Sequence, residues 1–183
     1  MARIVLFGAT GYTGKLAAQA LVNRGEKPVL AARSPGKLDD LAAELGGGLE
    51  TATADVSRPD TVRALVERGD VLVTTVGPFA RWGGPAVEAA IASGAHYVDS
   101  TGEPEFVRAV FERYGPGAQA AGCGLVTAMG YDWVPGNLAG ALALREAGDR
   151  AIRVDLGYFM TGRAGSGDMS GGTRASAAGA VTA

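Results

Sequence analysis

Three glycines near the N-terminus have a spacing that suits a phosphate-binding backbone. The run VLFGATGYTGK covers residues 5–15 and places glycines at 8, 11 and 14. A short apolar run precedes this loop and a helical pattern over 12–25 follows it, which is the setting that a dinucleotide fingerprint requires. Gly8 would allow a sharp turn, Gly11 a close approach to a pyrophosphate, and Gly14 close packing of the helix on the sheet. The loop therefore predicts a dinucleotide site.

The other residues of this loop that we predict to contact the pyrophosphate are Thr10, Tyr12 and Thr13. Here the free amide hydrogens and the positive end of the helix dipole would face the anion. The Gly-x-x-Gly-x-x-Gly spacing is one residue wider than the commonest fingerprint and also occurs in NADP-using families. A P-loop fits less well, because Ala9 replaces its first glycine and Leu16 replaces the magnesium-binding Ser or Thr. Glycines that serve packing alone are the remaining alternative.

The residues after the second predicted strand distinguish NADP from NAD. An NAD site uses an acidic residue there to hold the ribose 2′-hydroxyl, but residues 32–34 are Ala, Arg and Ser. Arg33 could instead pair with a 2′-phosphate, assisted by Ser34 and Lys37. An ordinary solvated arginine is the alternative. The pattern favours NADP(H) as the cofactor.

Ligands of open α/β sheets bind beyond the carboxyl ends of the strands, and further candidates lie there. Asp55 follows the third predicted strand and could accept a hydrogen bond from the adenine amino group or cap the helix that starts near Ser57. After the fourth strand the backbone would pass near the nicotinamide or form a plain turn; the residues concerned are Val76, Gly77, Pro78 and Phe79.

Polar and aromatic residues after the fifth and sixth strands predict a pocket wall for the substrate. They are Thr101-Gly102-Glu103 and Gly130-Tyr131-Asp132-Trp133. We assign substrate contacts to Tyr131, Asp132 and Trp133, and a catalytic or substrate-orienting role to Asp132. A helix cap is the alternative role for Asp132.

Six apolar, β-rich runs alternate with helical patterns, and they are expected at 3–7, 28–32, 49–54, 70–76, 96–100 and 124–129. Apolar runs without alternation are typical of parallel strands covered on both faces. Helices are expected to start at Ser34-Pro35, Ser57, Pro85 and Pro104, and to end before the glycines at 46, 69 and 94. The repeated β-α order predicts an α/β fold, a Rossmann-like doubly wound parallel sheet over residues 1–150.

After residue 150 the pattern changes. Ile152, Val154, Leu156 and Tyr158 alternate with polar or small residues, which predicts a strand with one buried face. One strand and part of a helix cannot bury a core of their own. We therefore interpret 151–183 as the beginning of a truncated second domain, for substrate binding or dimerisation. A homodimer is one alternative for the oligomeric state.

Composition argues against several classes of partner. The net charge of −2 does not favour nucleic acid or an anionic membrane surface. No apolar stretch approaches the roughly 20 residues of a membrane span, and no signal peptide is visible. The sequence holds one histidine, His96, and one cysteine, Cys123, so we expect no metal site built from them. We expect a cytoplasmic protein.

Six blocks of sequence resemble the saccharopine dehydrogenase-like oxidoreductases, a family that includes proteins of actinobacteria named trans-acting enoyl reductases. They are GATGYTGK (8–15), AARS (31–34), TTVGPF (74–79), YVDSTGE (97–103), GYDWVP (130–135) and SGGTRAS (170–176). The resemblance implies an NADP-binding Rossmann-like domain, a second α+β domain, and hydride transfer between NADPH and a small-molecule or acyl-chain substrate. Many relatives read Gly-Phe-Asp-Ser-x-Pro in the fifth block, so Asp132 and Pro135 match while Tyr131 and Trp133 differ.

The sequence is therefore compatible with two functions. The first is an NADP(H)-dependent oxidoreductase that acts on an enoyl, imine or keto group. The second is a non-catalytic NADP(H)-sensing regulator, which the sequence supports by offering no clear acid–base pair. In particular, no tyrosine is followed four residues later by lysine, so the catalytic pair of short-chain dehydrogenases is absent.

Overall fold

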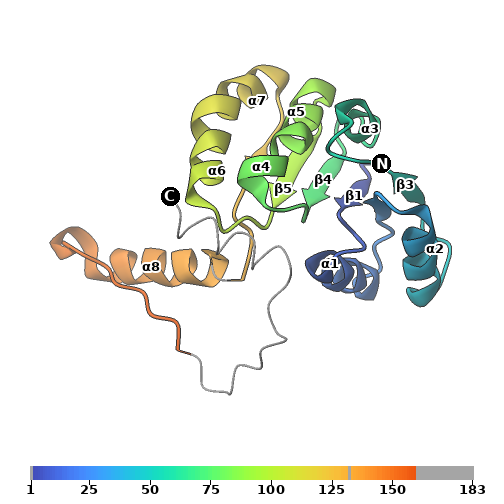
Figure 1. Cartoon of the computed structure of the whole chain (residues 1–183). Coiled ribbons are helices and arrows are strands. Elements are labelled where there is room, and N and C mark those ends of the chain that lie inside the picture. The colour runs from blue at the N-terminus through green and yellow to red at the C-terminus, as the bar shows by residue number, and fades with distance from the viewer. Residues whose placement is uncertain (1, 132, 160–183) are drawn as a thin grey trace.

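The structure is a computed structural model that describes residues 2–131 and 133–159. Over these residues six strands form one parallel sheet in the order β3-β2-β1-β4-β5-β6 (Figure 1). This order reverses direction between β1 and β4, the arrangement of a Rossmann-like doubly wound fold. The strands are β1 (Ile4–Phe7), β2 (Val29–Ala32), β3 (Thr51–Thr53), β4 (Val71–Thr74), β5 (His96–Asp99) and β6 (Leu125–Val126).

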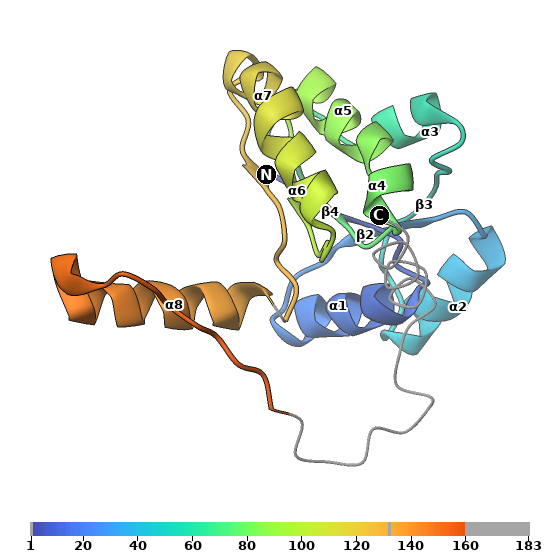
Figure 2. The ribbon, with the colours of Figure 1, turned by 60° about the vertical axis from the view of Figure 1, so that its left-hand side comes forward.

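Helices cover both faces of the sheet. α1 (Tyr12–Asn23) and α2 (Pro35–Glu44) pack on one face, as Figure 2 shows. The opposite face carries α3 (Pro59–Arg63), α4 (Phe79–Trp82), α5 (Gly84–Ser93), α6 (Pro104–Ala109) and α7 (Gly115–Ala121). A π-helical turn, Val110–Tyr114, joins α6 to α7.

The central strand β1 shows why the strand sequences are apolar without alternation. Val5 and Phe7 lie in the core beneath α3, α5 and α6, whereas Leu6 lies in the core beneath α1 and α2. All three residues are at most 1% exposed. A parallel strand buried on both faces needs apolar residues at successive positions, and the predicted sheet is confirmed.

Helix ends follow the predicted breakers at two positions. Gly46 has φ +98° and Gly94 has φ +71°, a left-handed conformation that glycine adopts without steric penalty. The helix expected from Ser57 to about residue 68 is shorter than predicted, because α3 ends at Arg63. The Leu65 amide bonds to the carbonyl of Val62 instead of continuing the α-helical pattern.

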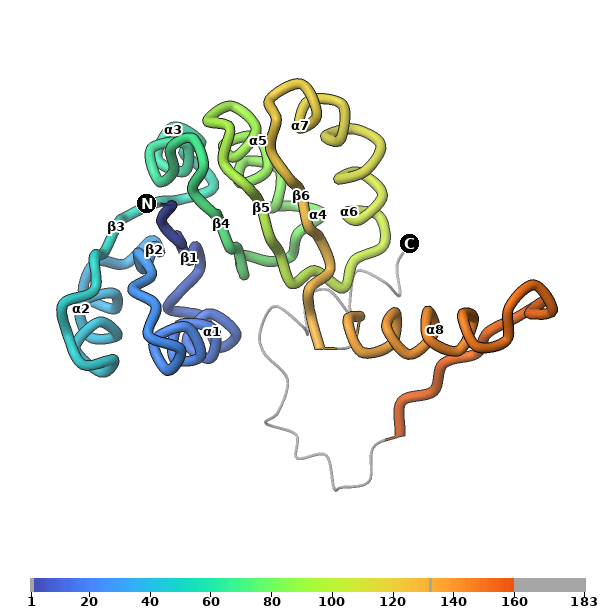
Figure 3. The backbone as a smooth tube through the Cα atoms, turned by 180° about the vertical axis from the view of Figure 1, so that it is seen from behind, coloured from blue at the N-terminus to red at the C-terminus, as the bar shows by residue number. Residues whose placement is uncertain are grey.

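The predicted strand over 152–158 is wrong. Residues 151–159 form no strand and run back along α8 (Trp133–Ala147), which extends away from the sheet (Figure 3). The side chains of Val154 and Leu156 lie next to Gly140, where an added Cβ would be 3.6 and 3.5 Å from them. The alternation thus marks contact with a helix, because no strand of the described residues lies beside 151–159 to form a hydrogen-bonded ladder. The remainder of the predicted second domain, 160–183, lies outside the described residues.

None of the helices within 2–131 and 133–159 combines the length and the apolar character needed to cross a lipid bilayer.

Candidate functional site

A cleft of about 530 Å³ opens beyond the carboxyl ends of β1, β2, β3 and β4. It lies where the strand order reverses, which is where open α/β sheets bind their ligands. The structure brings together here most of the predicted cofactor residues: Gly8, Thr10, Gly11, Arg33, Ser34, Lys37, Asp55, Val76 and Gly77. The cleft is also lined by residues that the sequence reasoning did not single out: Phe7, Ala32, Val56, Ser57, Thr75 and Trp82.

The first turn of the glycine loop is fixed between two strands. Gly8 has φ +91°, and a Cβ at this position would lie 2.7 Å from Oγ1 of Thr75. The amides of Gly8 and Ala9 donate to the carbonyl of Ala31 at 2.8 and 3.1 Å. Thr75 Oγ1 in turn donates to the Gly8 carbonyl at 3.2 Å. Only glycine fits the required conformation and the available space.

The second half of the loop leads into α1 and leaves the first amides of that helix without a partner within it. A Cβ on Gly14 would overlap the Gly8 carbonyl oxygen and approach Ala9 Cα to 2.8 Å, so the helix packs directly on the loop. Gly11 is the N-cap and supplies no side-chain cap. The first amides of α1, those of Tyr12, Thr13 and Gly14, therefore have no acceptor within the helix. These three residues do not line the cleft, so their predicted contribution rests on backbone amides alone.

Two cations stand on the β2 side of the cleft. Arg33 and Lys37 are exposed, and neither forms a salt bridge with any other described residue. Ser34 is the N-cap of α2, but its hydroxyl makes no cap hydrogen bond. One hydroxyl and two cations are thus available to an anionic group, which is the donor set that a 2′-phosphate requires.

Asp55 forms a local turn. Its Oδ1 accepts hydrogen bonds from the amide and the hydroxyl of Ser57, both at 2.9 Å. These two bonds, and to a smaller extent the charge of Arg33, lower the pKa of Asp55 below its ordinary value. The N-cap of α3 is Arg58, so Asp55 holds the turn before the helix and does not occupy the cap position. A contact with adenine stays a prediction.

The segment after β4 divides between the cleft and the core. Gly77 lines the cleft, the Gly77–Pro78 peptide bond is cis, and Pro78 is the N-cap of α4. The Phe79 side chain is 7% exposed and packs on the ring of Phe106, with centroids 5.7 Å apart. Phe79 therefore faces the core and not the cleft. Its side chain is not placed to contact the cofactor, contrary to what the sequence predicts for this residue.

A buried carboxylate organises the loops beyond β5 and β6. Asp99 is 1% exposed and accepts hydrogen bonds from the amides of Thr101 and Ala128, both at 2.9 Å, and from the Thr127 hydroxyl at 2.8 Å. Thr101 Oγ1 then accepts from the amide of Glu103 at 3.1 Å. The sequence reasoning missed this role of Asp99; the available signal was an acidic residue at the end of a buried strand.

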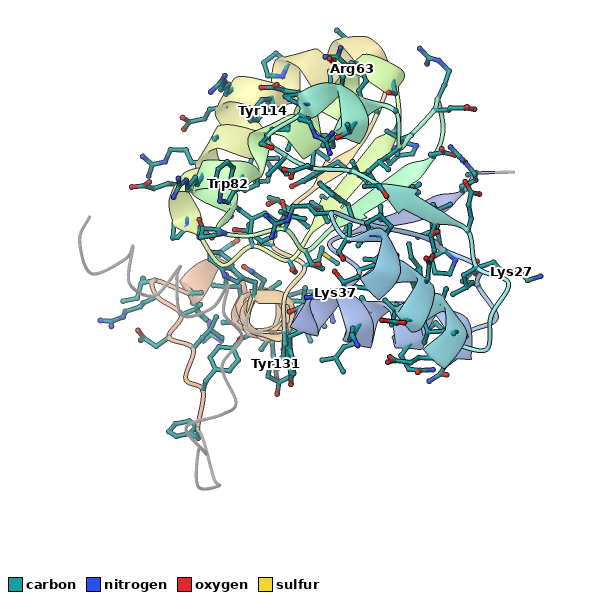
Figure 4. The ribbon with its side chains drawn as sticks, turned by 45° about the vertical axis from the view of Figure 1, so that its right-hand side comes forward. Lys27, Lys37, Arg63, Trp82, Tyr114 and Tyr131 are labelled. Carbon is teal, nitrogen blue, oxygen red and sulfur yellow. The ribbon has the colours of Figure 1, made fainter. Side chains whose placement is uncertain are left out.

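The predicted substrate residues are not part of this cleft. Tyr131 is 85% exposed beside the first turn of α8 (Figure 4), and Trp133 is the first residue of that helix. Asp132 lies outside the described residues. None of the three is among the residues that line the cleft in the described part of the chain, so their roles stay predictions.

The fold and the cleft define a dinucleotide-binding domain of Rossmann-like type. Residues 4–127 match the family model described as the saccharopine dehydrogenase NADP binding domain. The chain belongs to this family, and NADP(H) is the cofactor that the family domain binds.

Relatives of known name share much of the sequence. A Mycobacterium tuberculosis protein provisionally named a trans-acting enoyl reductase is 41% identical over 181 residues, which cover 94% of this chain and 42% of that protein. The trans-acting enoyl reductase of Mycobacterium leprae is 40% identical over 140 residues, which cover 74% of this chain and 34% of the relative. This chain thus spans less than half the length of these relatives.

Solved structures confirm the fold. Apo saccharopine dehydrogenase from Saccharomyces cerevisiae aligns with a TM-score of 0.60 at 18% identity, covering 80% of this chain and 32% of that one. Triphenylmethane reductase from Citrobacter sp., complexed with NADP(H), aligns with a TM-score of 0.52 at 18% identity, covering 68% and 48%. At this level of identity the likeness shows a shared fold.

Proposed function

We propose that the protein is an NADP(H)-dependent oxidoreductase that transfers hydride between the nicotinamide and an organic substrate. The observation that carries the proposal is the cleft itself. It combines a glycine loop at the N-terminus of α1 with Arg33 and Lys37, two cations that form no salt bridge with any described residue. The names of the relatives support an oxidoreductase and favour an enoyl group, on a small molecule or an acyl chain, as the group reduced.

The residues of the cleft divide the binding task. The amides of Tyr12, Thr13 and Gly14 in the first turn of α1 hold the pyrophosphate, and the absence of a side chain at Gly8 and Gly11 lets the anion approach them. Arg33, Ser34 and Lys37 hold the 2′-phosphate, which distinguishes NADP from NAD. The backbone of Val76 and Gly77 lies beside the ribose and the nicotinamide of the coenzyme. When bound, the cofactor supplies or accepts the hydride.

The substrate side is assigned to the loop after β6. Tyr131 and Trp133 supply apolar contact area, and Asp132 orients the substrate or holds a proton. These assignments follow from the position of the loop beyond the carboxyl end of β6, next to the expected nicotinamide end.

Calorimetry and an absorbance assay test the function in sequence. The first expected result is heat on titration with NADPH and much less with NADH. The second is loss of NADPH absorbance when enoyl, imine and keto compounds are offered in turn, with enoyl compounds active. Absence of heat with either coenzyme would refute the cofactor site. Tight NADPH binding with no turnover on any of the three groups would favour an NADP(H) sensor instead.

A further inference from the structure

We propose that the indole ring of Trp82 is the wall of the cleft on which the adenine ring of NADP(H) stacks. This inference rests on the proposed function, because it concerns how the same cleft holds the coenzyme. Trp82 is the last residue of α4, the short helix that begins directly after the Gly77–Pro78 turn. Figure 4 shows that the side chain projects from this helix.

Trp82 is the aromatic side chain of the cleft that can offer a ring face. The described residues that line the cleft include two aromatic ones, Phe7 and Trp82. Phe7 is 1% exposed and belongs to the core, whereas Trp82 is only partly buried. A base inside the cleft would therefore meet the indole and not the phenyl ring.

Arg81 leaves one face of the indole available. Its guanidinium carbon lies 4.6 Å from the centroid of the Trp82 ring, a cation–π distance. Arg81 is not among the residues that line the cleft. Because Trp82 lines the cleft and Arg81 does not, we assign the face of the indole opposite the guanidinium to the ligand.

The adenine is the better occupant than the nicotinamide. The cleft is lined by loops after β1, β2, β3 and β4, and among its described lining residues none comes from the loops after β5 or β6. Arg33, on the β2 side, is assigned to bind the 2′-phosphate, which the coenzyme carries on its adenosine ribose. The adenine is attached to that same ribose, so it shares this cleft with the 2′-phosphate, whereas the nicotinamide lies at the other end of the pyrophosphate.

The backbone of α4, which carries Trp82, is held at both ends. The Glu103 carboxylate accepts hydrogen bonds from the amides of Phe79 and Ala80 at the start of α4. At the other end of this helix, a Cβ on Gly83 would lie 2.6 Å from Cε2 of Phe106, so the backbone rests directly on the core. The position of Trp82 at the cleft therefore needs no rearrangement of this helix when a base stacks on the indole.

Tryptophan fluorescence provides the test. The sequence has two tryptophans, at 82 and 133, so Trp133→Phe leaves Trp82 as the single emitter. The probe is adenosine 2′,5′-bisphosphate, which carries the adenine and the 2′-phosphate and does not absorb tryptophan emission. We expect saturable quenching of Trp82 in W133F, and no quenching in W82F, in which Trp133 is the emitter. Trp82→Ala should weaken binding of the bisphosphate about tenfold, as loss of one base–aromatic stack does.

Control measurements separate the outcomes. Phe111→Ala removes another exposed aromatic ring, on the turn between α6 and α7, and should leave the affinity for the bisphosphate unchanged. Circular dichroism of W82A and W82F checks that both variants fold, and W82F keeps a ring should W82A fail to fold. Heat of bisphosphate binding without any change in Trp82 emission would overturn the stacking, as would quenching by nicotinamide mononucleotide alone. Absence of heat with both the bisphosphate and NADPH would refute the proposed function itself.

Discussion

The carboxylate of Glu103 accepts a hydrogen bond from the amide of Phe79 at 2.9 Å, across 24 positions of sequence. Its second oxygen accepts from the next amide, that of Ala80, at 2.8 Å. The two donors are the first amides of α4, which have no acceptor within that helix. The loop after β5 thereby fixes the end of the segment that follows β4, and Gly77 of that segment lines the cleft.

Glu103→Gln should loosen this junction without removing the side chain. The amide group of glutamine can accept only one of the two bonds, and its NH₂ would face the other N–H. We expect the free energy of unfolding to fall by about 1.5 kcal/mol, the lower range for a hydrogen bond to a charged group. With W133F as background, the emission of Trp82 should also shift. Glu105→Gln, on the exposed side of α6, should change neither quantity.

Arg33→Ala tests the cofactor preference. If Arg33 pairs with the 2′-phosphate, its loss should cost about 1.5–3 kcal/mol of NADPH binding free energy and leave NADH affinity nearly unchanged. Titration calorimetry with both coenzymes measures this difference. Lys27→Ala removes a cation at the opposite end of the sheet, before β2 (Figure 4), and should affect neither coenzyme. Equal losses for both coenzymes in R33A would contradict the assignment.

The cofactor loop could be predicted from sequence because its determinants are local. Gly8 and Gly14 follow an apolar strand at fixed spacing, and the steric demand on Gly14 comes from Gly8 and Ala9 of the loop itself. The close approach of Thr75 to Gly8 comes from a distant part of the chain and could not be predicted in the same way. Arg33 could be placed for the same reason, since it is the first residue after β2. The family match over residues 4–127 confirms NADP(H) as the cofactor, and the role of Arg33 stays a prediction.

Other features depend on contacts between distant parts of the chain and could not be read from local patterns. The sequence predicts that Phe79 contacts the cofactor, yet the ring of Phe79 packs on that of Phe106 in the core. Trp82 reaches the cleft because α4 makes one short turn after Pro78. Asp99 has three hydrogen-bond donors that belong to two loops. Periodicity carries no information about any of these pairings.

A pair of glycine substitutions tests whether the packing of α1 on the loop requires glycine at position 14. Gly14→Ala places a methyl group against the Gly8 carbonyl and Ala9 Cα, so α1 must move away from the loop. We expect a loss of about 1–3 kcal/mol in stability, the range for overpacking a well-packed core, and a marked loss of NADPH binding. Thermal unfolding and calorimetry measure both.

Gly36→Ala is the matched control. Gly36 is also a helical glycine, in the first turn of α2, but a Cβ there would meet nothing within 4 Å. Alanine should therefore stabilise the protein by up to about 1 kcal/mol through helix propensity. Destabilisation of G36A equal to that of G14A would show that the effect comes from glycine loss in general and not from the packing of α1.

Asp70 gives a prediction for pH. This carboxylate is 4% exposed and accepts hydrogen bonds from the Arg3 amide at 3.0 Å, from Arg3 Nη2 at 2.7 Å and from the Glu67 amide at 3.0 Å. Burial alone would raise the pKa of Asp70, but these bonds outweigh burial and lower that pKa in the folded state. The stabilisation is therefore fully present above the ordinary aspartate pKa of about 3.9 and is lost as the pH falls through the lower folded value.

Asp70→Asn should remove that dependence. At pH 7 we expect a loss of about 2–3 kcal/mol in the free energy of unfolding, as for hydrogen bonds to a charged group. Below about pH 4 the difference between wild type and D70N should shrink, because the unfolded chain then binds a proton at Asp70 that the folded protein takes up only at a lower pH. Urea unfolding over this pH range measures the difference, with Asp39→Asn on the exposed side of α2 as control. A difference that stays constant as the pH falls below about 4 would show that packing, and not the charge of Asp70, stabilises this junction between the start of β1 and the start of β4.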